Sequence, residues 1–372
     1  MSLIVDGTTG VTFNDSSLQG AAASPYVLKN RIINGDMRID QRNAGASLTP
    51  TTDGQYNLDR FQVYISQASK FSVQQNAGSV TPPAGFNYYA GITSLSSYTV
   101  GASDYFCFVQ NIEGYNIGDF AWGTASAKTV TLSFWVRSSL TGTFGASIRN
   151  GAANYSFPFT YTISSANTWE QKTVTITAPT SGTWATTNTS GLQVIFGLGV
   201  GTSNSGTANA WTGSSVLSVT GAASVVGTNG ATFYITGVQL EIGTSATPFE
   251  RRLYNQELAN CQRYYWMLAP NQSGNRPIGT WSYLLSNYIE GYLQYPVKMR
   301  TVPSLDSPTI TDGYDIYRAG ASDSFNAIIF GSATDNAVFL YATSGVSGTG
   351  GQSGSVYCRN TYASYVALSA EL

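Results

Sequence analysis

The stretch TVTLSFWVR, residues 129–137, alternates polar and apolar side chains over nearly the full length of a β-strand. Because successive side chains of a strand point to opposite faces, the stretch predicts a strand with one buried and one solvated face. Residues 172–177 and 232–240 repeat the pattern, and the Gly, Ser and Thr clusters at 180–182 and 202–206 are typical of turns. A long series of short strands without intervening helices predicts an all-β jelly-roll sandwich over residues 28–250.

A short helix is expected after the strand-rich region. The stretch TPFE, residues 247–250, has the spacing of a helix capping box or a tight turn. Leu258, Cys261 and Tyr265 then recur at helical spacing, which predicts a short helical linker over residues 251–269. This apolar stripe packs either on the preceding sandwich or against copies of itself around a symmetry axis, and two helical turns do not decide between the two.

The two ends of the chain differ from its middle. Strand-like stretches return from residue 270, which predicts a smaller C-terminal β domain over residues 270–372. Residues 1–27 are mostly small and polar and cannot bury a core alone. We interpret this N-terminal segment as an anchor that docks into a larger assembly, and a frayed chain end is the alternative.

Composition narrows the range of partners. Of the 372 residues, 42% are hydrophobic and 10% are charged, against about 25% charged residues in an ordinary soluble domain. Few charges mean weak self-repulsion, so close self-association is tolerated. The net charge of −2 and the lack of any run of Lys or Arg argue against nucleic acid as a partner. No apolar stretch approaches the roughly 18–20 residues of a membrane span, so membrane insertion is not expected.

The residue types also bear on catalysis. The chain has no histidine, which removes the commonest general base and the commonest transition-metal ligand together. Its three cysteines are odd in number and far apart, so we expect no disulfide framework and assembly in a reducing host cytoplasm. Glu113 with Asp119, or Asp104 nearby, is the best carboxylate pair for glycan cleavage, but such a pair is a generic motif. The sequence therefore predicts no catalytic residue, no metal site, no cofactor and no enzymatic activity.

Charged residues concentrate at two places in this charge-poor chain. One cluster lies between Arg31 and Arg60, and the other lies between Glu241 and Arg263. The first and last strands of a jelly roll often lie close together. We therefore expect the two clusters to pair as a network of Arg–carboxylate contacts with a structural role.

Several segments match, in order and at consistent spacing, a known protein module. They include NRIINGDM at 30–37, LDRF at 58–61, LSFWVRSS at 132–139 and ATFYITGVQLE at 231–241. Over roughly residues 28–266 the chain resembles bacteriophage tail-fibre and other virion-appendage proteins. The resemblance implies a jelly roll similar to carbohydrate-binding modules, carried on a phage particle and often trimeric, and it transfers no catalytic residue. Leu253 departs from many relatives, in which a proline is expected.

Aromatic side chains are the strongest candidates for ligand binding, because the C–H face of a sugar stacks on a ring while polar groups bind its hydroxyls. Trp184 and Trp211 lie in stretches rich in Gly, Ser and Thr, and Tyr155 begins a series of alternating aromatic residues. Trp281 and Tyr288 offer a second candidate surface in the C-terminal domain. Burial in a core is the competing interpretation for each ring.

Together these features predict a non-catalytic tail-fibre protein on the exterior of a phage virion. We expect it to assemble as a homotrimer and to bind a host-surface glycan as its receptor during attachment. The N-terminal segment would connect it to other virion proteins. A capsid-decorating head fibre or a purely structural virion protein is the alternative interpretation.

Overall fold

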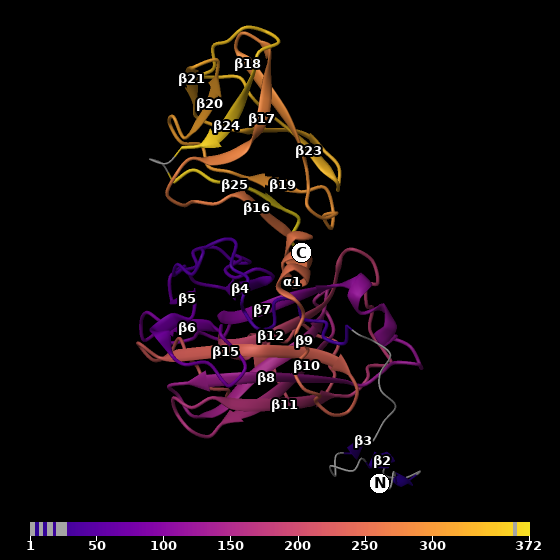
Figure 1. Ribbon diagram of the computed structural model, residues 1–372. Coiled ribbons are helices and arrows are strands. Elements are labelled where there is room, and N and C mark those ends of the chain that lie inside the picture. The colour runs from indigo at the N-terminus through magenta and orange to yellow at the C-terminus, as the bar shows by residue number, and fades with distance from the viewer. Residues whose placement is uncertain (1–3, 7–9, 13–17, 20–27, 360–362) are drawn as a thin grey trace.

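The computed structural model describes residues 4–6, 10–12, 18–19, 28–359 and 363–372. A large β-sandwich is followed by one α-helix and by a distal β domain (Figure 1). Most of the N-terminal segment that is predicted to be an anchor lies outside the described residues. Within it, the backbones of β1 (Ile4–Asp6), β2 (Gly10–Thr12) and β3 (Leu18–Gln19) form a small antiparallel sheet.

Two antiparallel five-stranded sheets pack face to face in the sandwich. We call them the front sheet, with the order β10-β9-β12-β7-β4, and the back sheet, with the order β11-β8-β15-β6-β5. The front sheet consists of β4 (Phe61–Ile65), β7 (Tyr105–Glu113), β9 (Gly142–Asn150), β10 (Ser156–Ile163) and β12 (Ser190–Val200). The back sheet consists of β5 (Phe71–Gln75), β6 (Ala90–Ser94), β8 (Val130–Ser138), β11 (Glu170–Ile176) and β15 (Thr232–Ile242). The predicted all-β jelly-roll sandwich is confirmed.

The connections of the sandwich contain short elements. Strands β13 (Ser205–Gly206) and β14 (Ser218–Val219) pair in parallel. Single 3₁₀ turns occur at Ala77–Ser79, Gly114–Asn116, Gly118–Phe120 and Thr202–Asn204.

Strand β8 shows why an alternating sequence forms this sandwich. Val130, Leu132, Phe134 and Val136 are fully buried in the main core. The ring centroid of Phe134 lies 5.1 Å from that of Phe196 on β12 of the front sheet. Each such side chain contributes about 1.5–3 kcal/mol by leaving water. The alternation of residues 129–137 therefore supplies the surface that joins the two sheets.

The segment 30–37 closes a bulge in the back sheet. Strand β15 shifts its register against β8 just before Gln239, so Val238 has no pairing partner in β8. The N–H of Val238 instead donates to the carbonyl oxygen of Gly35 at 2.9 Å. The carbonyl oxygen of Val238 accepts Asn30 Nδ2 at 3.1 Å. The beginning of the first charged cluster is thereby held against the last long strand of the sandwich.

The predicted helical linker contains both a helix, α1 (Tyr254–Gln262), and a strand, β16 (Tyr265–Ala269). The helix does not begin at the TPFE stretch, because the hydroxyl of Thr247 donates to Glu241 Oε2 at 2.7 Å and the Thr247 N–H donates to Oε1 of the same carboxylate at 2.8 Å. Cys261, on the predicted apolar stripe, is fully buried within the chain. At this residue the stripe packs intramolecularly.

The distal domain has a core of its own. A seven-stranded sheet has the order β21-β20-β24-β17-β18-β23-β22, and a three-stranded sheet has the order β16-β25-β19. Their strands besides β16 are β17 (Arg276–Leu285), β18 (Tyr288–Gln294), β19 (Ser304–Asp306), β20 (Tyr314–Arg318), β21 (Ala321–Phe325), β22 (Ile329–Ala333), β23 (Ala337–Ala342), β24 (Ser353–Cys358) and β25 (Val366–Ser369). In the part of the chain that the structure describes, no helix is long and apolar enough to cross a membrane.

The substitution Gly35→Ala is expected to destabilise the sandwich. A Cβ at residue 35 would lie 2.2 Å from the carbonyl oxygen of Val238. The backbone must then shift, which costs about 1–3 kcal/mol of unfolding free energy and is measured by chemical denaturation. Gly213→Ala is the matched control, because a Cβ there meets no atom within 4 Å. Equal stabilities of the two variants would contradict the role of residues 30–37 in closing the bulge.

Candidate functional site

Trp184, Trp211 and Tyr155, which are predicted to be binding rings, lie together with Trp122. The centroid of Trp211 lies 5.6 Å from that of Trp184 and 5.4 Å from that of Tyr155, whose ring is nearly parallel to it. The Trp122 centroid lies 4.7 Å from that of Trp184. The indole N–H groups of Trp184 and Trp211 donate to backbone carbonyl oxygens at 3.2 and 2.8 Å. These half-buried rings pack on one another and on the core, and both indole donors are already used.

The two predicted rings of the distal domain have different surroundings. Trp281 is 1% exposed, so no ligand reaches its ring without unfolding the core. Tyr288 is half-buried and stacks on Tyr341, with 5.3 Å between centroids and 12° between ring planes. Phe339 continues this column 5.7 Å from Tyr341. Tyr341 therefore covers one face of the Tyr288 ring.

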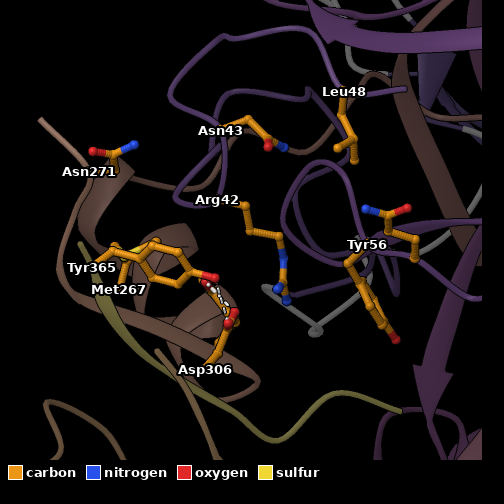
Figure 2. A pocket seen from close by; sticks show the side chains of 10 residues that line it. Arg42, Asn43, Leu48, Tyr56, Met267, Asn271, Asp306 and Tyr365 are labelled. Carbon is orange, nitrogen blue, oxygen red and sulfur yellow. Dashed lines mark hydrogen bonds between the residues drawn. The ribbon is translucent and has the colours of Figure 1, made fainter. Parts of the chain in front are cut away.

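A cleft of about 390 Å³ lies between the sandwich and the distal domain (Figure 2). We call it the interdomain cleft. Rings, amides and two charged groups line it: Arg42, Asn43, Leu48, Gln55, Tyr56, Tyr265, Met267, Asn271, Asp306 and Tyr365.

The charged groups of the interdomain cleft are paired within the chain. Arg42 donates to Glu371 Oε1 at 2.9 Å, and its guanidinium carbon lies 3.5 Å from the ring centroid of Tyr265. Asp306 accepts hydrogen bonds from the hydroxyls of Tyr265 at 3.1 Å and Tyr365 at 2.8 Å, the latter visible in Figure 2. Because these charged groups already have partners within the chain, we interpret their contacts as part of the interface that orients the distal domain. We call this interface, which includes Arg42, Asp306 and Glu371, the joint.

The joint continues beneath the cleft. Arg60 is 1% exposed and forms an ion pair with Glu371. Arg42 and Arg60 belong to the first charged cluster, whose expected partner was the second cluster. That expectation was wrong for these two arginines, because their carboxylate partner is Glu371 near the end of the distal domain. In the second cluster, Arg263 pairs with Glu113 at 2.6 Å.

The carboxylates considered for glycan cleavage are engaged in ion pairs and hydrogen bonds. Glu113 is 1% exposed and binds Arg263 through both carboxylate oxygens, at 2.6 and 2.9 Å. Burial alone raises the pKa of Glu113, but the hydrogen bonds from Arg263 and Tyr264 outweigh it and lower the pKa below its ordinary value. Asp119 pairs with Arg31 at 2.6 Å. Among the described residues, no three His, Cys, Asp or Glu side chains gather in a group that could hold a metal ion.

The outer face of the front sheet carries a second hollow, of about 250 Å³, which we call the front-sheet groove. Strand alternation explains its position, since Phe106 and Phe108 of β7 point into the core while Tyr105 and Cys107 point outward. The groove is lined by Asp53, Tyr64, Tyr105, Arg149, Asn204, Ser215 and Leu217.

A hydrogen-bonded chain of polar groups organises the front-sheet groove. Arg149 is 8% exposed; its Nε donates to Gln193 Oε1 and its Nη1 donates to Ser215 Oγ, both at 2.7 Å. Gln193 Nε2 donates to the Tyr64 hydroxyl at 3.0 Å. Burial lowers the pKa of Arg149 and raises that of Tyr64 from their ordinary values. These groups are held in place before any ligand arrives.

The rim of the groove adds further donors and acceptors. The Tyr105 hydroxyl donates to Asp53 Oδ2 at 3.3 Å, and the Ile65 N–H donates to Asp53 Oδ1 at 2.8 Å. Asn204 Nδ2 donates to the Ser103 carbonyl oxygen at 2.9 Å. Tyr64 and Tyr105 are half-buried, and no aromatic ring stacks on either of them in the described residues. The Arg149 guanidinium carbon lies 5.7 Å from the Tyr64 ring centroid, so Tyr105 has the more open ring. Accessible rings beside fixed polar groups suit a ligand with apolar C–H faces and many hydroxyls.

Sequence reasoning did not find the residues of the front-sheet groove. Tyr64 and Tyr105 occur in ordinary strand contexts, and they become neighbours of Arg149 only through the strand order of the front sheet. One local signal existed, because Arg149 is a charged residue in a strand whose other side chains are small or apolar.

No family model matches the sequence, and no curated protein matches it. Among solved structures, the enzymatically active domain of tailspike protein 4 of bacteriophage CBA120 is 16% identical over 60% of this chain and 22% of that domain's chain, with a TM-score of 0.31. A family 11 carbohydrate-binding module of a Clostridium thermocellum cellulase is 11% identical over 55% of this chain and 99% of the module, with a TM-score of 0.26. A carbohydrate-binding module in complex with β-1,4-galactotriose is 10% identical over 58% of this chain and 100% of the module, with a TM-score of 0.30. Similarities this low assign neither a family nor a ligand.

The substitution Glu371→Ala is expected to lower the free energy of unfolding by about 3–5 kcal/mol, because it leaves the buried Arg60 without its carboxylate. Asp335→Ala is the control within the same domain. It removes an ion pair at 2.9 Å with Lys298, whose side chain is 63% exposed, and should cost less than about 1 kcal/mol. Chemical denaturation followed by tryptophan fluorescence measures both effects. A Glu371→Ala effect as small as that of the control would contradict the assignment of the joint.

Proposed function

We propose that this chain is a non-catalytic phage fibre protein that binds a host-surface glycan in the front-sheet groove during adsorption. The observation that carries the proposal is the groove itself. Two tyrosine rings, Tyr64 and Tyr105, lie beside a guanidinium, a carboxylate, an amide and a hydroxyl in one hollow. Saccharide binding needs this combination, because rings stack on C–H faces and directional polar groups select hydroxyl positions.

The hydrogen bonds and ion pairs that the polar groups already form favour the front-sheet groove over the interdomain cleft as the binding site. In the cleft, Arg42 and Asp306 are bonded to partners within the chain. In the groove, the Ser215 hydroxyl accepts from Arg149 and so keeps its own proton for donation. Asn204 uses one amide hydrogen on a backbone carbonyl and retains a carbonyl oxygen for a ligand. A glycan can therefore add hydrogen bonds in the groove without first breaking an ion pair.

The remaining parts of the proposal rest on the sequence. The resemblance of residues 28–266 to virion-appendage proteins supports a location on the phage exterior. The low charge, 10% of residues, supports close self-association as a homotrimer. The ion pairs that hold Glu113 and Asp119 support a protein that binds without cleaving.

The substitution Tyr105→Ala is expected to weaken binding to purified host-surface polysaccharide by at least about 2 kcal/mol, or roughly 30-fold in Kd, because it removes a stacking ring from the groove. Isothermal titration calorimetry measures the change. Tyr115→Ala is the matched control, because Tyr115 belongs to the same sandwich, is 63% exposed and does not line the groove.

Adsorption assays test the biological side of the same proposal. Purified wild-type chain should slow phage adsorption, the Tyr105→Ala variant should not, and the Tyr115→Ala variant should behave as wild type. No effect of the wild-type chain at saturating concentration would refute a role in receptor binding.

A further inference from the structure

Arg149 is nearly buried, and it forms no ion pair with a carboxylate of the described residues. It is 8% exposed, and among the described residues Arg60 and Arg276 are buried to a similar or greater degree. Arg60 pairs with Glu371. Arg276 donates to the carbonyl oxygens of Gly274 and Ser364, each at 2.7 Å, and to that of Arg359 at 3.0 Å. Of these three arginines, Arg149 alone has neither a carboxylate partner nor a set of backbone carbonyl oxygens as acceptors.

The groups around Arg149 balance its charge only in part. Its guanidinium carbon lies 5.7 Å from the ring centroid of Tyr64, and the Asp53 carboxylate stabilises the charge from a distance, but the effect of burial is larger and lowers the pKa of Arg149. Its hydrogen-bond partners, Gln193 and Ser215, are neutral side chains. Among the described residues that line the groove, Asp53 is the one carboxylate, and its hydrogen bonds come from Tyr105 and Ile65 rather than from Arg149. Burying a guanidinium without a paired anion is costly. The open side of the groove is where a balancing anion can approach.

We infer that the front-sheet groove selects an acidic glycan, whose sugar carboxylate binds the Arg149 guanidinium. This inference rests on the proposed function and names its ligand class. A guanidinium and a carboxylate match in shape, and their charge-assisted hydrogen bonds are about twice as strong as neutral ones. Asp53 lines the same groove and repels a dianionic phosphate ester more strongly than a monoanionic carboxylate, which favours the carboxylate. Uronic acids and nonulosonic acids such as sialic acid both supply this group.

Matched pairs of ligands test the inference on the full chain. Trigalacturonate and 3′-sialyllactose are each titrated in native form and after reduction of the carboxyl group to an alcohol, which removes the charge and keeps the linkages. At least one acidic form is expected to bind roughly tenfold or more tightly than its reduced form. The pair that shows this preference identifies the source of the carboxylate.

Two groove variants and one control assign the preference to its residue. Arg149→Gln should abolish the difference between acidic and reduced forms, whatever it does to the affinity for the reduced form. Asp53→Asn should strengthen binding of the acidic form severalfold, because it removes a negative charge that repels the carboxylate of the ligand. Residue 53 is exposed and not needed for the core. Arg137→Gln, on β8 of the back sheet, should leave the preference unchanged. Circular dichroism and melting temperatures verify that each variant is folded.

The outcomes separate the two proposals. Equal binding of acidic and reduced forms in both pairs, or a preference that survives Arg149→Gln, overturns the acidic ligand and leaves glycan binding in place. A failure of all four ligands to bind counts against both the acidic ligand and the glycan function. Should Arg149→Gln fail to fold, Asp53→Asn still decides, since unchanged affinity for the acidic form contradicts a carboxylate in the groove.

Discussion

The buried ion pair between Arg60 and Glu371 holds the two domains of this chain in one arrangement. The Arg60 guanidinium also donates to the Asn111 carbonyl oxygen and lies 3.6 Å from the ring centroid of Tyr264. The backbone of Arg60 is left-handed, with φ of 69°. This conformation costs energy, and a non-glycine residue keeps it where several surrounding contacts hold it in place. Glu371 reaches this site from the C-terminal end of the distal domain. At the other end of that domain, its first strand, β16 (Tyr265–Ala269), connects it to the sandwich through the preceding helix. Attachment at both ends fixes an orientation that a single linker would leave variable.

This joint also explains how far the sequence predicts the fold. The alternation in residues 129–137 has a local cause, the burial of every second side chain, so it identified β8 (Val130–Ser138) to within one residue at either end. The same reasoning indicated the sandwich, the short helix and the return of strands. Ion-pair partners follow no local pattern. Arg60 and Glu371 lie 311 residues apart, and only the packed domains bring them together. Charge clustering therefore indicated where the network lies but not which carboxylates complete it.

The candidate site could be predicted less well than the fold, for a related reason. Sequence context favoured Trp184 and Trp211 because they lie in turn-rich stretches. The structure places them in an aromatic cluster, and their indole N–H groups already donate to the backbone carbonyl oxygens of Ser181 and Thr177. Tyr64, Tyr105 and Arg149 come from three strands that the order β9-β12-β7-β4 brings onto one face. Strand order and register are properties of the folded sheet, and a single sequence shows neither. The charged Arg149, in a strand that has no other charged residue, was the one available local sign.

The joint and the groove use charge in opposite ways. In the joint, Arg42 and Arg60 converge on Glu371, so the cost of removing these groups from water is offset within the chain. In the groove, Arg149 is removed from water almost as fully, but its fixed partners are the neutral Gln193 and Ser215. The first arrangement is complete without a ligand and stabilises the fold. The second is electrostatically incomplete, and an anion bound there gains a charge-assisted contact without breaking an ion pair. In a chain where 10% of residues are charged, that difference separates the surface that holds the domains together from the surface that is open to a ligand.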